Sequence, residues 1–115
     1  MTFSQTEDAT QDIEEALLWS AEHFGRAAAR RYRSLIATAI LEIVANPDLA
    51  GSRNVHGLPC GIKIYHIRHS KTRAAVDGLI VKRPRHFIAY RLLDSQMVEI
   101  VRVLHDSMDI ESPFV

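Results

Sequence analysis

The amino-acid sequence predicts an α+β fold with the order β–α–α–β–β–β, in which an N-terminal helical hairpin packs on a small antiparallel sheet. Two observations lead to this prediction. Apolar residues recur at helical spacing through the first 45 residues, and three runs rich in β-branched and aromatic residues follow in the second half. Helices and strands that are segregated in this way are typical of α+β proteins. The length of 115 residues indicates a single domain, residues 1–115.

The first predicted strand is short, from Thr2 to Gln5, and a helix follows it. Thr6 is the expected N-cap, because a threonine side chain can accept a hydrogen bond from the first helical turn. The apolar stripe of this helix consists of Ala9, Ile13, Ala16, Leu17, Ser20 and Phe24. Leu18 and Trp19 lie off that stripe, so one or both are expected to be exposed.

A second helix is expected over residues 26–45, after Gly25. Its apolar stripe consists of Tyr32, Leu35, Ile36, Ala39, Ile40, Ile43 and Val44. Pro47 follows Asn46 and stops the helix, because proline cannot continue a helix interior. Two amphipathic helices that are joined by a single glycine predict an antiparallel helical hairpin.

Three β-rich runs follow, at residues 61–69, 85–93 and 97–105. The first alternates in strand fashion until a slip of phase at Tyr65, which predicts a bulge there. The connection 70–84 contains the turn pair Asp77-Gly78, which predicts that the strands extend around it. Residues 94–96 predict the turn of a hairpin between the last two runs.

The last run ends in the segment RVLHDSMD, residues 102–109. Strand alternation places Val101, Val103 and His105 on one face. Asp106 is then predicted to cap one helical turn, with Asp109 three residues later in a capping-box arrangement. In this interpretation His105 is a hydrogen-bonded structural residue.

The net charge is zero, but its distribution along the chain is uneven. Residues 1–52 hold eight acids and four arginines, residues 53–91 hold nine Lys/Arg and one acid, and residues 92–115 hold five acids and one arginine. A basic middle segment of this kind predicts an acidic partner, either nucleic acid or protein. The alternative is that the basic segment pairs with the acidic flanks of the same chain.

Several functional classes lack their signature in the sequence. There is no phosphate-binding loop, dinucleotide fingerprint or paired-cysteine zinc pattern. Cys60 is the single cysteine, which excludes an internal disulfide and predicts a reducing, cytoplasmic environment. No secretory signal is recognisable, and no apolar run approaches the roughly 20 residues of a membrane span. His66 and His69 point to opposite faces of a strand, so no metal site is expected.

Arginine and histidine side chains gather in the second half of the sequence and allow two interpretations. A metal-free ribonuclease needs a base, an acid and cations at the phosphate, and Arg68, Arg91 and His105 are the candidates for these roles. A basic sheet surface that binds an acidic partner needs no catalytic group. We favour the binding interpretation, in which the protein is not an enzyme and uses no cofactor.

An ordered set of short motifs resembles a known family. The motifs are TEDATQDI at 6–13, FG at 24–25, NP at 46–47, GIK at 61–63, RHFIAYR at 85–91 and RVLHDSMD at 102–109. In this order they are similar to the landmarks of the ParE toxins of ParD/ParE type II toxin–antitoxin systems, within the RelE/ParE superfamily. The resemblance covers nearly the whole chain and implies the β–α–α–β–β–β fold. At residues 110–115 the sequence IESPFV departs from the Arg-His-Leu run typical of the family.

The resemblance implies a toxin that a ParD-like antitoxin neutralises and that inhibits DNA gyrase by binding. The antitoxin carries a ribbon–helix–helix DNA-binding part, so the toxin is expected to meet DNA only through its partner. A RelE-like ribonuclease that cleaves mRNA and a non-toxic relative are the alternatives.

The expected site residues follow from the binding interpretation together with the resemblance to ParE toxins. The expected antitoxin contacts are Leu18, Trp19, Arg68 and Arg85, because exposed apolar side chains and basic groups suit an acidic amphipathic tail. The expected target contacts are Arg91, Arg102, His105 and Asp109. The antitoxin tail is expected to lay a helix along the hairpin and to pair a strand with an open sheet edge. No membrane contact is expected.

Overall fold

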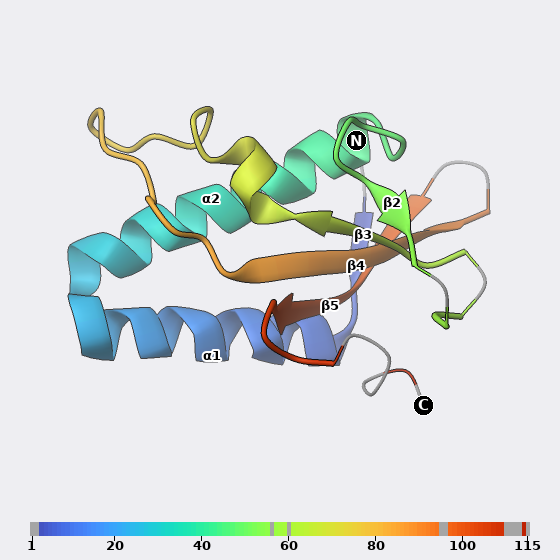
Figure 1. Ribbon diagram of the computed structural model, residues 1–115, viewed down its shortest axis with the longest axis horizontal. Helices are drawn as coiled ribbons and strands as arrows, with labels where there is room; N and C mark the ends of the chain where they lie inside the picture. The colour runs from blue at the N-terminus through green and yellow to red at the C-terminus, as the bar shows by residue number, and fades with distance from the viewer. Residues whose placement is uncertain (1–2, 56, 60, 95–96, 110–113, 115) are drawn as a thin grey trace.

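A hairpin of two long helices covers one face of a five-stranded sheet (Figure 1). The computed structural model describes residues 3–55, 57–59, 61–94, 97–109 and 114. The elements in chain order are β1 (Phe3–Gln5), α1 (Glu7–Phe24), α2 (Arg26–Ala45), β2 (Arg53–Asn54), β3 (Lys63–His66), the 3-10 helix η1 (Ile67–Ser70), β4 (His86–Leu93) and β5 (Met97–His105). This arrangement confirms the predicted α+β class and adds the short strand β2.

The sheet is mixed, in the order β1-β5-β4-β3-β2. Neighbouring strands are antiparallel except at one edge, where β1 runs parallel to β5 with Phe3 opposite Val98. The purely antiparallel sheet expected from the sequence therefore does not hold for β1. A strand of three residues carries too short a pattern to indicate its direction, and its partner lies at the other end of the chain.

Helix α1 begins at the predicted cap. The Oγ1 atom of Thr6 accepts the N–H of Ala9 (3.0 Å) and donates to the carbonyl of Val101 (2.7 Å), so it joins α1 to β5. Ala9 is fully buried, whereas Phe24 is 67% exposed. The predicted place of Phe24 in the buried stripe is wrong, because the α1–α2 turn at Gly25 projects past the ends of the strands (Figure 1).

Helix α2 has the predicted bounds and supplies most of the core. Its buried residues are Leu35, Ile36, Ala39, Ile40, Ile43 and Val44. They share one apolar cluster with the sheet residues Tyr65, Ile88, Tyr90, Val98, Ile100 and Val103. After the helix ends at Asn46, the carbonyl of Pro47 accepts the hydroxyl of Tyr90, so the stop signal in the sequence is also a contact with the sheet.

The sheet face away from the helices carries a second, smaller apolar cluster. It consists of Ile62, Ile64, Phe87 and Ala89, against which Val55, Leu58, Val101 and Phe114 pack. Phe114 belongs to the segment 110–115 in which the sequence departs from the ParE pattern. The other residues of that segment, and Cys60, lie outside the described residues.

A bulge in β5 changes which side chains share a face. Ala89 pairs with Arg102, but Tyr90 pairs with Ile100, so Val101 is the extra residue. Val103 therefore packs under the helices, while Val101 joins the opposite cluster. The predicted bulge at Tyr65 is wrong, and so is the predicted common face of Val101 and Val103.

The segment between β3 and β4 is mostly irregular. Strand β3 ends at His66 because Ile67–Ser70 turns into a 3-10 helix, and the Nδ1 atom of His66 accepts the N–H of Arg68 (3.0 Å). Asp77 (φ 53°) and Gly78 (φ 78°) form a turn that a single bridge between Val76 and Leu79 closes. The predicted extension of the strands is limited to that bridge. None of the helices in the described residues has the length and apolar character needed to cross a membrane.

Candidate functional site

A groove of about 1440 Å³ lies between the helical hairpin, the segment 79–86 and the end of β5. Trp19 and Phe24 line it from α1, Leu79 and Val81 from the segment before β4, and Met108 from the turn after β5. The exposed fractions of Trp19, Phe24 and Leu79 are 53%, 67% and 57%. Large apolar side chains that are exposed around one hollow mark a binding surface more often than a solvated one.

The aromatic wall of the groove is partly pre-ordered. The ring of Trp19 stacks on the ring of His23, with centroids 4.0 Å apart and an interplanar angle of 17°. Phe24 meets Trp19 edge-on at 5.5 Å. The Nδ1 atom of His23 and the carbonyl of Trp19 are hydrogen-bonded (2.8 Å). These contacts restrict the rotamer of Trp19, so binding against it loses less side-chain entropy.

The charged part of the lining is mainly basic. The basic residues are Arg31, Lys82, Arg83, Arg85 and Arg102, and the acidic residues are Asp12 and Glu15. Lys82 and Arg83 form no ion pair with a described residue. The lining therefore favours an occupant with negative charge.

Part of the basic segment 53–91 is neutralised within the chain. Four of its basic residues form ion pairs with carboxylates: Lys63 with Asp48, Arg73 with Glu42, Arg85 with Asp106 and Arg91 with Glu99. The alternative that the basic segment pairs with the acidic flanks therefore holds for these four residues, and an acidic partner stays a prediction. The cations of the groove lining without an ion pair to a described residue are Arg31 of α2 and Lys82 and Arg83 just before β4.

Asp12 fixes one wall of the groove by binding the bulged strand. Its Oδ2 atom accepts hydrogen bonds from Nε–H of Arg102 (2.8 Å) and from the N–H of Val103 (2.9 Å), and its Oδ1 atom accepts one from Nη2–H of Arg102 (3.0 Å). This bidentate pair spans α1 and β5. Arg102 is consequently held by its own chain before any partner binds.

A tyrosine and two histidines form the floor of the groove. The Oη atom of Tyr32 accepts the N–H of Arg85 (3.0 Å) and lies 2.5 Å from Nδ1 of His86. The phenol proton has no other acceptor among the described residues, so it is donated to His86. The Nδ1 atom of His105 accepts the N–H of Ser107 (3.1 Å) and its hydroxyl (2.7 Å). Each of the two neutral rings therefore carries its proton on Nε2.

Asp106 joins the ends of three strands beneath this floor. Its Oδ2 atom accepts Nε2–H of His66 (3.0 Å), and its Oδ1 atom accepts Nε of Arg85 (2.8 Å). Burial alone would raise the pKa of Asp106, but these two hydrogen bonds lower it. The predicted capping role of Asp106 is wrong, because both oxygens bind side chains and His105 accepts the Ser107 N–H instead.

Burial sets the protonation states of this cluster. It lowers the pKa of His86 to about 4, and the neighbouring His105 contributes in the same direction. Burial also lowers the pKa of His66, although the hydrogen bond to Asp106 opposes the change. It raises the pKa of Tyr32 to about 12. His86 is therefore neutral and Tyr32 protonated near pH 7.

The comparisons with known proteins identify the family. The sequence matches the ParE toxins of the parDE type II toxin–antitoxin systems over residues 3–110. The chain belongs to this ParE toxin family. A solved structure described as "Chromosomal ParDE TA system from P. aeruginosa" has a TM-score of 0.67 and 12% identity, and the match covers 91% of this chain and 95% of that chain. At such identity the likeness shows a common fold. No curated protein matches the sequence.

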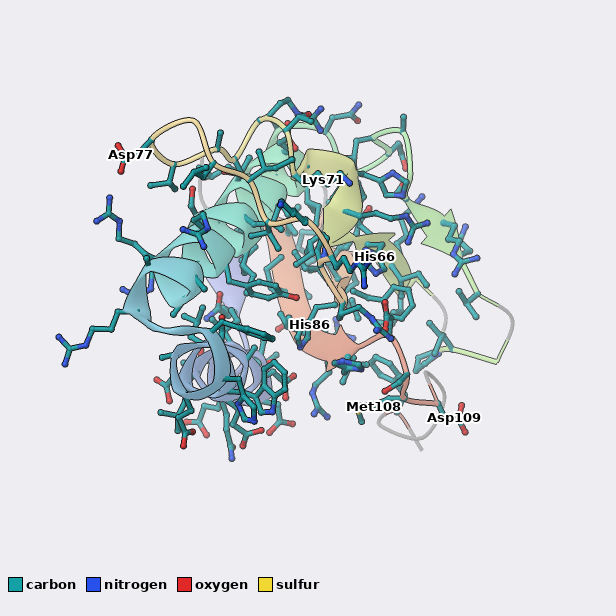
Figure 2. The ribbon with its side chains drawn as sticks, turned by 60° about the vertical axis from the view of Figure 1, so that its left-hand side comes forward. His66, Lys71, Asp77, His86, Met108 and Asp109 are labelled. Atoms are coloured by element: carbon teal, nitrogen blue, oxygen red, sulfur yellow. The ribbon has the colours of Figure 1, made fainter. Side chains whose placement is uncertain are left out.

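Half of the site residues predicted for this ParE-family chain lie in the groove. Trp19 and Arg85 were assigned to the antitoxin, and Arg102 and His105 to the target. The structure brings these four together on one surface. Figure 2 labels two further groove residues, His86 and Met108, and also His66, which binds Asp106.

The other predicted residues of the ParE-family chain lie outside the groove lining. Leu18 is exposed on α1, Arg68 is exposed on η1, and Asp109 is exposed in the turn region after β5. Arg91 binds Glu99 (2.8 Å) near the far end of β4. Because His105 pairs with His86 and β4 rises about 3.3 Å per residue, Arg91 lies about 17 Å along the strand from His105.

Sequence reasoning missed several groove residues. The sequence predicts Tyr32 as part of the apolar stripe of α2, and nothing in the sequence indicates its contact with His86. Phe24 was assigned to the core of α1. The adjacent cations Lys82 and Arg83 lie in the connection 70–84, for which the sequence predicted only the turn at Asp77-Gly78. An aromatic residue beside the glycine of a helical turn is the one signal that could have indicated this surface.

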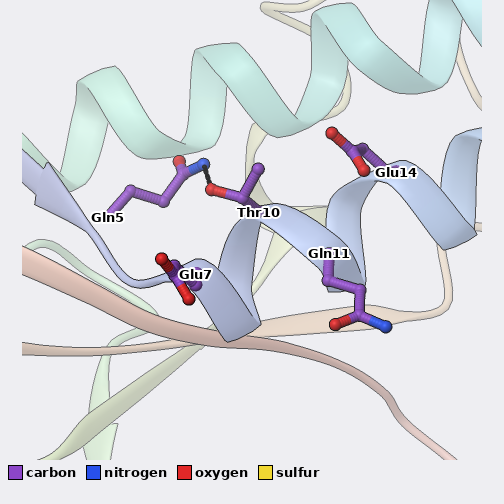
Figure 3. A pocket seen from close by; sticks show the side chains of 5 residues that line it. All are labelled: Gln5, Glu7, Thr10, Gln11 and Glu14. Atoms are coloured by element: carbon purple, nitrogen blue, oxygen red, sulfur yellow. Dashed lines mark hydrogen bonds between the residues drawn. The ribbon is translucent and has the colours of Figure 1, made fainter.

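A second hollow, of about 430 Å³, lies at the start of α1 (Figure 3). Its lining consists of Gln5, Glu7, Thr10, Gln11 and Glu14. Gln5 Nε2 donates to the hydroxyl of Thr10 (2.8 Å). Among the described residues, no group of three or more His, Cys, Asp or Glu side chains is placed to hold a metal ion. The hollow is polar and shallow, and we assign no function to it.

Proposed function

We propose that this ParE-family chain is a toxin that a ParD-like antitoxin neutralises by occupying the groove. The groove carries the proposal, because it combines exposed apolar side chains from separate segments with a basic lining. An acidic amphipathic segment would cover Trp19, Phe24 and Leu79 and meet Lys82 and Arg83. Exposed Leu18 and Arg68 would extend the contact beyond the groove.

Neutralisation by occlusion follows from the overlap of the two sets of predicted contacts. Arg102 and His105 are proposed to meet the target, and they line the same groove as Trp19 and Arg85. An antitoxin segment in the groove would cover part of the target surface. Arg91 and Asp109 would extend the target surface outside the groove.

The proposed action is inhibition of DNA gyrase by binding, without catalysis, in the cytoplasm. The placement of the ribonuclease candidates supports binding, since Arg91 lies about 17 Å along β4 from His105 and faces Glu99. A general base and a phosphate-binding cation have to reach one scissile group. DNA contact would occur only through the antitoxin.

The first experiment separates the three candidate functions. The chain is expressed alone and together with the antitoxin gene expected beside its own gene. Growth arrest that the antitoxin reverses is the expected result, and the purified chain should then inhibit supercoiling by gyrase. Codon-dependent cleavage of translated mRNA would establish the ribonuclease alternative instead. Normal growth at confirmed expression would indicate a non-toxic relative.

The second experiment tests the groove as the antitoxin site. Trp19→Ala removes an exposed aromatic anchor, and Leu41→Ala removes a similarly exposed side chain on α2 outside the groove. We expect Trp19→Ala to weaken antitoxin binding about tenfold or more, while Leu41→Ala leaves it unchanged. Equal affinities for both variants would place the antitoxin elsewhere on the surface.

A further inference from the structure

Two imidazole N–H groups in the groove have no hydrogen-bond acceptor among the described residues. His86 and His105 are opposite each other on β4 and β5, with ring centroids 5.3 Å apart and an interplanar angle of 82°. Both residues line the groove. Because Tyr32 and Ser107 use the two Nδ1 atoms, each neutral ring presents its Nε2–H as a free donor.

Two carboxylates that act electrostatically on His86, those of Asp12 and Asp106, are already engaged. Both oxygens of Asp12 accept hydrogen bonds from Arg102, and one of them also accepts the Val103 N–H. The oxygens of Asp106 accept hydrogen bonds from Arg85 and His66. Each oxygen of Asp12 and Asp106 thus already accepts a hydrogen bond, which leaves the Nε2–H groups to an acceptor from outside.

We propose that His86 and His105 form a carboxylate subsite, at which the two Nε2–H groups donate to an acidic side chain of the polypeptide in the groove. The inference rests on the proposed function for the identity of that polypeptide. Apolar walls at Trp19 and Val81 would hold the carbon chain of the acidic residue. Hydrogen bonds to a charged acceptor in such a partly dry site are stronger than neutral ones.

The charges around the pair favour an anion. The groups that face it are Asp12 and Glu15 of α1, Arg31 and Tyr32 of α2, His66 of β3, Lys82, Arg83 and Arg85 before β4, and Arg102 and Asp106 at β5. Asp12 pairs with Arg102 and Asp106 pairs with Arg85, which leaves Arg31, Lys82 and Arg83 against Glu15. The apolar walls favour a carboxylate on a polypeptide over a nucleic-acid phosphate, which the phosphate probe below tests.

Two substitutions of His105 separate donor and acceptor roles. In His105→Gln the amide nitrogen can take the place of Nε2–H, whereas in His105→Asn the amide oxygen can take the place of Nδ1 and accept the Ser107 N–H. The subsite requires the donor, so Gln should retain binding within about threefold and Asn should lose about tenfold. A purely structural role in capping the turn predicts the reverse order.

The probe is hydrocinnamate, and its neutral isostere hydrocinnamide is the matched control. At millimolar concentration we expect hydrocinnamate to shift the imidazole nitrogen resonances of His86 and His105 in wild type. The resonances of His86 should also shift in His105→Gln but not in His105→Asn. The amide should cause no such shift. Equal effects of acid and amide, absence of any shift, or tighter binding of inorganic phosphate at the same resonances would each overturn the subsite.

The antitoxin itself distinguishes failure of the subsite from failure of the proposed function. If the neighbouring antitoxin binds wild type and His105→Asn equally well, the subsite is wrong while the function stands. If no antitoxin binds but hydrocinnamate does, the proposed partner is wrong while the carboxylate chemistry stands. Thermal midpoints of both variants verify that each is folded.

Discussion

At Asp12, one carboxylate holds helix and sheet together beside the bulge. It accepts two hydrogen bonds from Arg102 and one from the backbone of Val103, and the side chains of Asp12 and Arg102 are 13% and 23% exposed. From the sequence, Arg102 was expected to contact a partner. Its pairing with Asp12 could not be predicted, because the two residues lie 90 positions apart and each has the pattern of an ordinary surface charge.

Replacement of Asp12 tests the strength of this link. Asp12→Ala leaves a mostly buried guanidinium and a backbone N–H without acceptors, so the free energy of unfolding should fall by about 3 kcal/mol. Glu22→Ala, an exposed substitution on the same helix, should change it by less than about 0.5 kcal/mol. Urea unfolding at neutral pH measures both. Similar midpoints for the two variants would mean that solvent replaces the Asp12 contacts.

Position 51 requires glycine for two reasons, its backbone conformation and the close approach of the His69 side chain. Its φ is +99°, and a Cβ atom built there would lie 2.8 Å from Cδ2 of His69. Gly61 has a φ of +88° with nothing within 4 Å of the same position, so it provides a control for backbone strain alone. We expect Gly61→Ala to cost about 1 kcal/mol and Gly51→Ala at least about 1 kcal/mol more. Equal costs, measured by urea unfolding, would show that the His69 ring moves freely.

Among the elements, helices were predictable and strand details were not. The stripe of α2 and the stop at Asn46 are local signals, and the structure places both ends of that helix as expected. The bulge at Val101 depends on how β5 pairs with β4, while the local sequence favours a regular strand throughout. The end of β3 is set by a side-chain contact of His66 with its own following turn. Strand pairing and side-chain packing decide these features, and the local periodicity of the sequence indicates neither of them.

Thr6 links the two kinds of element, which makes its hydroxyl more important than an ordinary cap. It accepts the Ala9 N–H and donates to the Val101 carbonyl at the bulge. Thr6→Ala should lower the free energy of unfolding by about 2 kcal/mol, the upper range for a cap, while Thr6→Ser keeps the hydroxyl and should cost only a few tenths. Chemical denaturation of the pair tests this. An equally large loss in Thr6→Ser would assign the effect to the methyl group.

For the whole molecule, half of the expected site residues line the groove, but the groove itself could not be predicted from the sequence. Exposure of Trp19 follows from helical periodicity, and the basic character of Arg85 and His105 is plain from the sequence. The groove exists because α1, the segment before β4 and the end of β5 meet at one end of the sheet. The resemblance to ParE toxins supplied the family, which the match over residues 3–110 confirms. The histidine floor could not be predicted, because the hydrogen bonds that fix which ring nitrogen carries the proton arise from tertiary contacts such as that of Tyr32 with His86.

The buried histidines predict that the molecule loses stability in mild acid. Unfolded histidine titrates near pH 6.5, whereas the pKa of folded His86 is about 4, and those of His66 and His69 are also lowered by burial. Between these values the unfolded chain binds more protons. The contribution of His86 is therefore complete above about pH 6.5 and is lost as the pH falls towards 4, by about 3 kcal/mol. The lowered pKa values of Asp106 and Glu42 act in the same direction at still lower pH.

His86→Gln isolates this effect from the carboxylates. The variant should be less stable than wild type at pH 7, because the hydrogen bond from Tyr32 is altered. Its free energy of unfolding should nevertheless change less between about pH 7 and pH 4.5, since the most strongly shifted histidine is gone. Urea unfolding across this range measures both slopes. If the free energy of unfolding changed as steeply with pH in His86→Gln as in wild type, the acid sensitivity would belong to His66 and His69. His86 would then be protonated in the folded protein without leaving the groove floor.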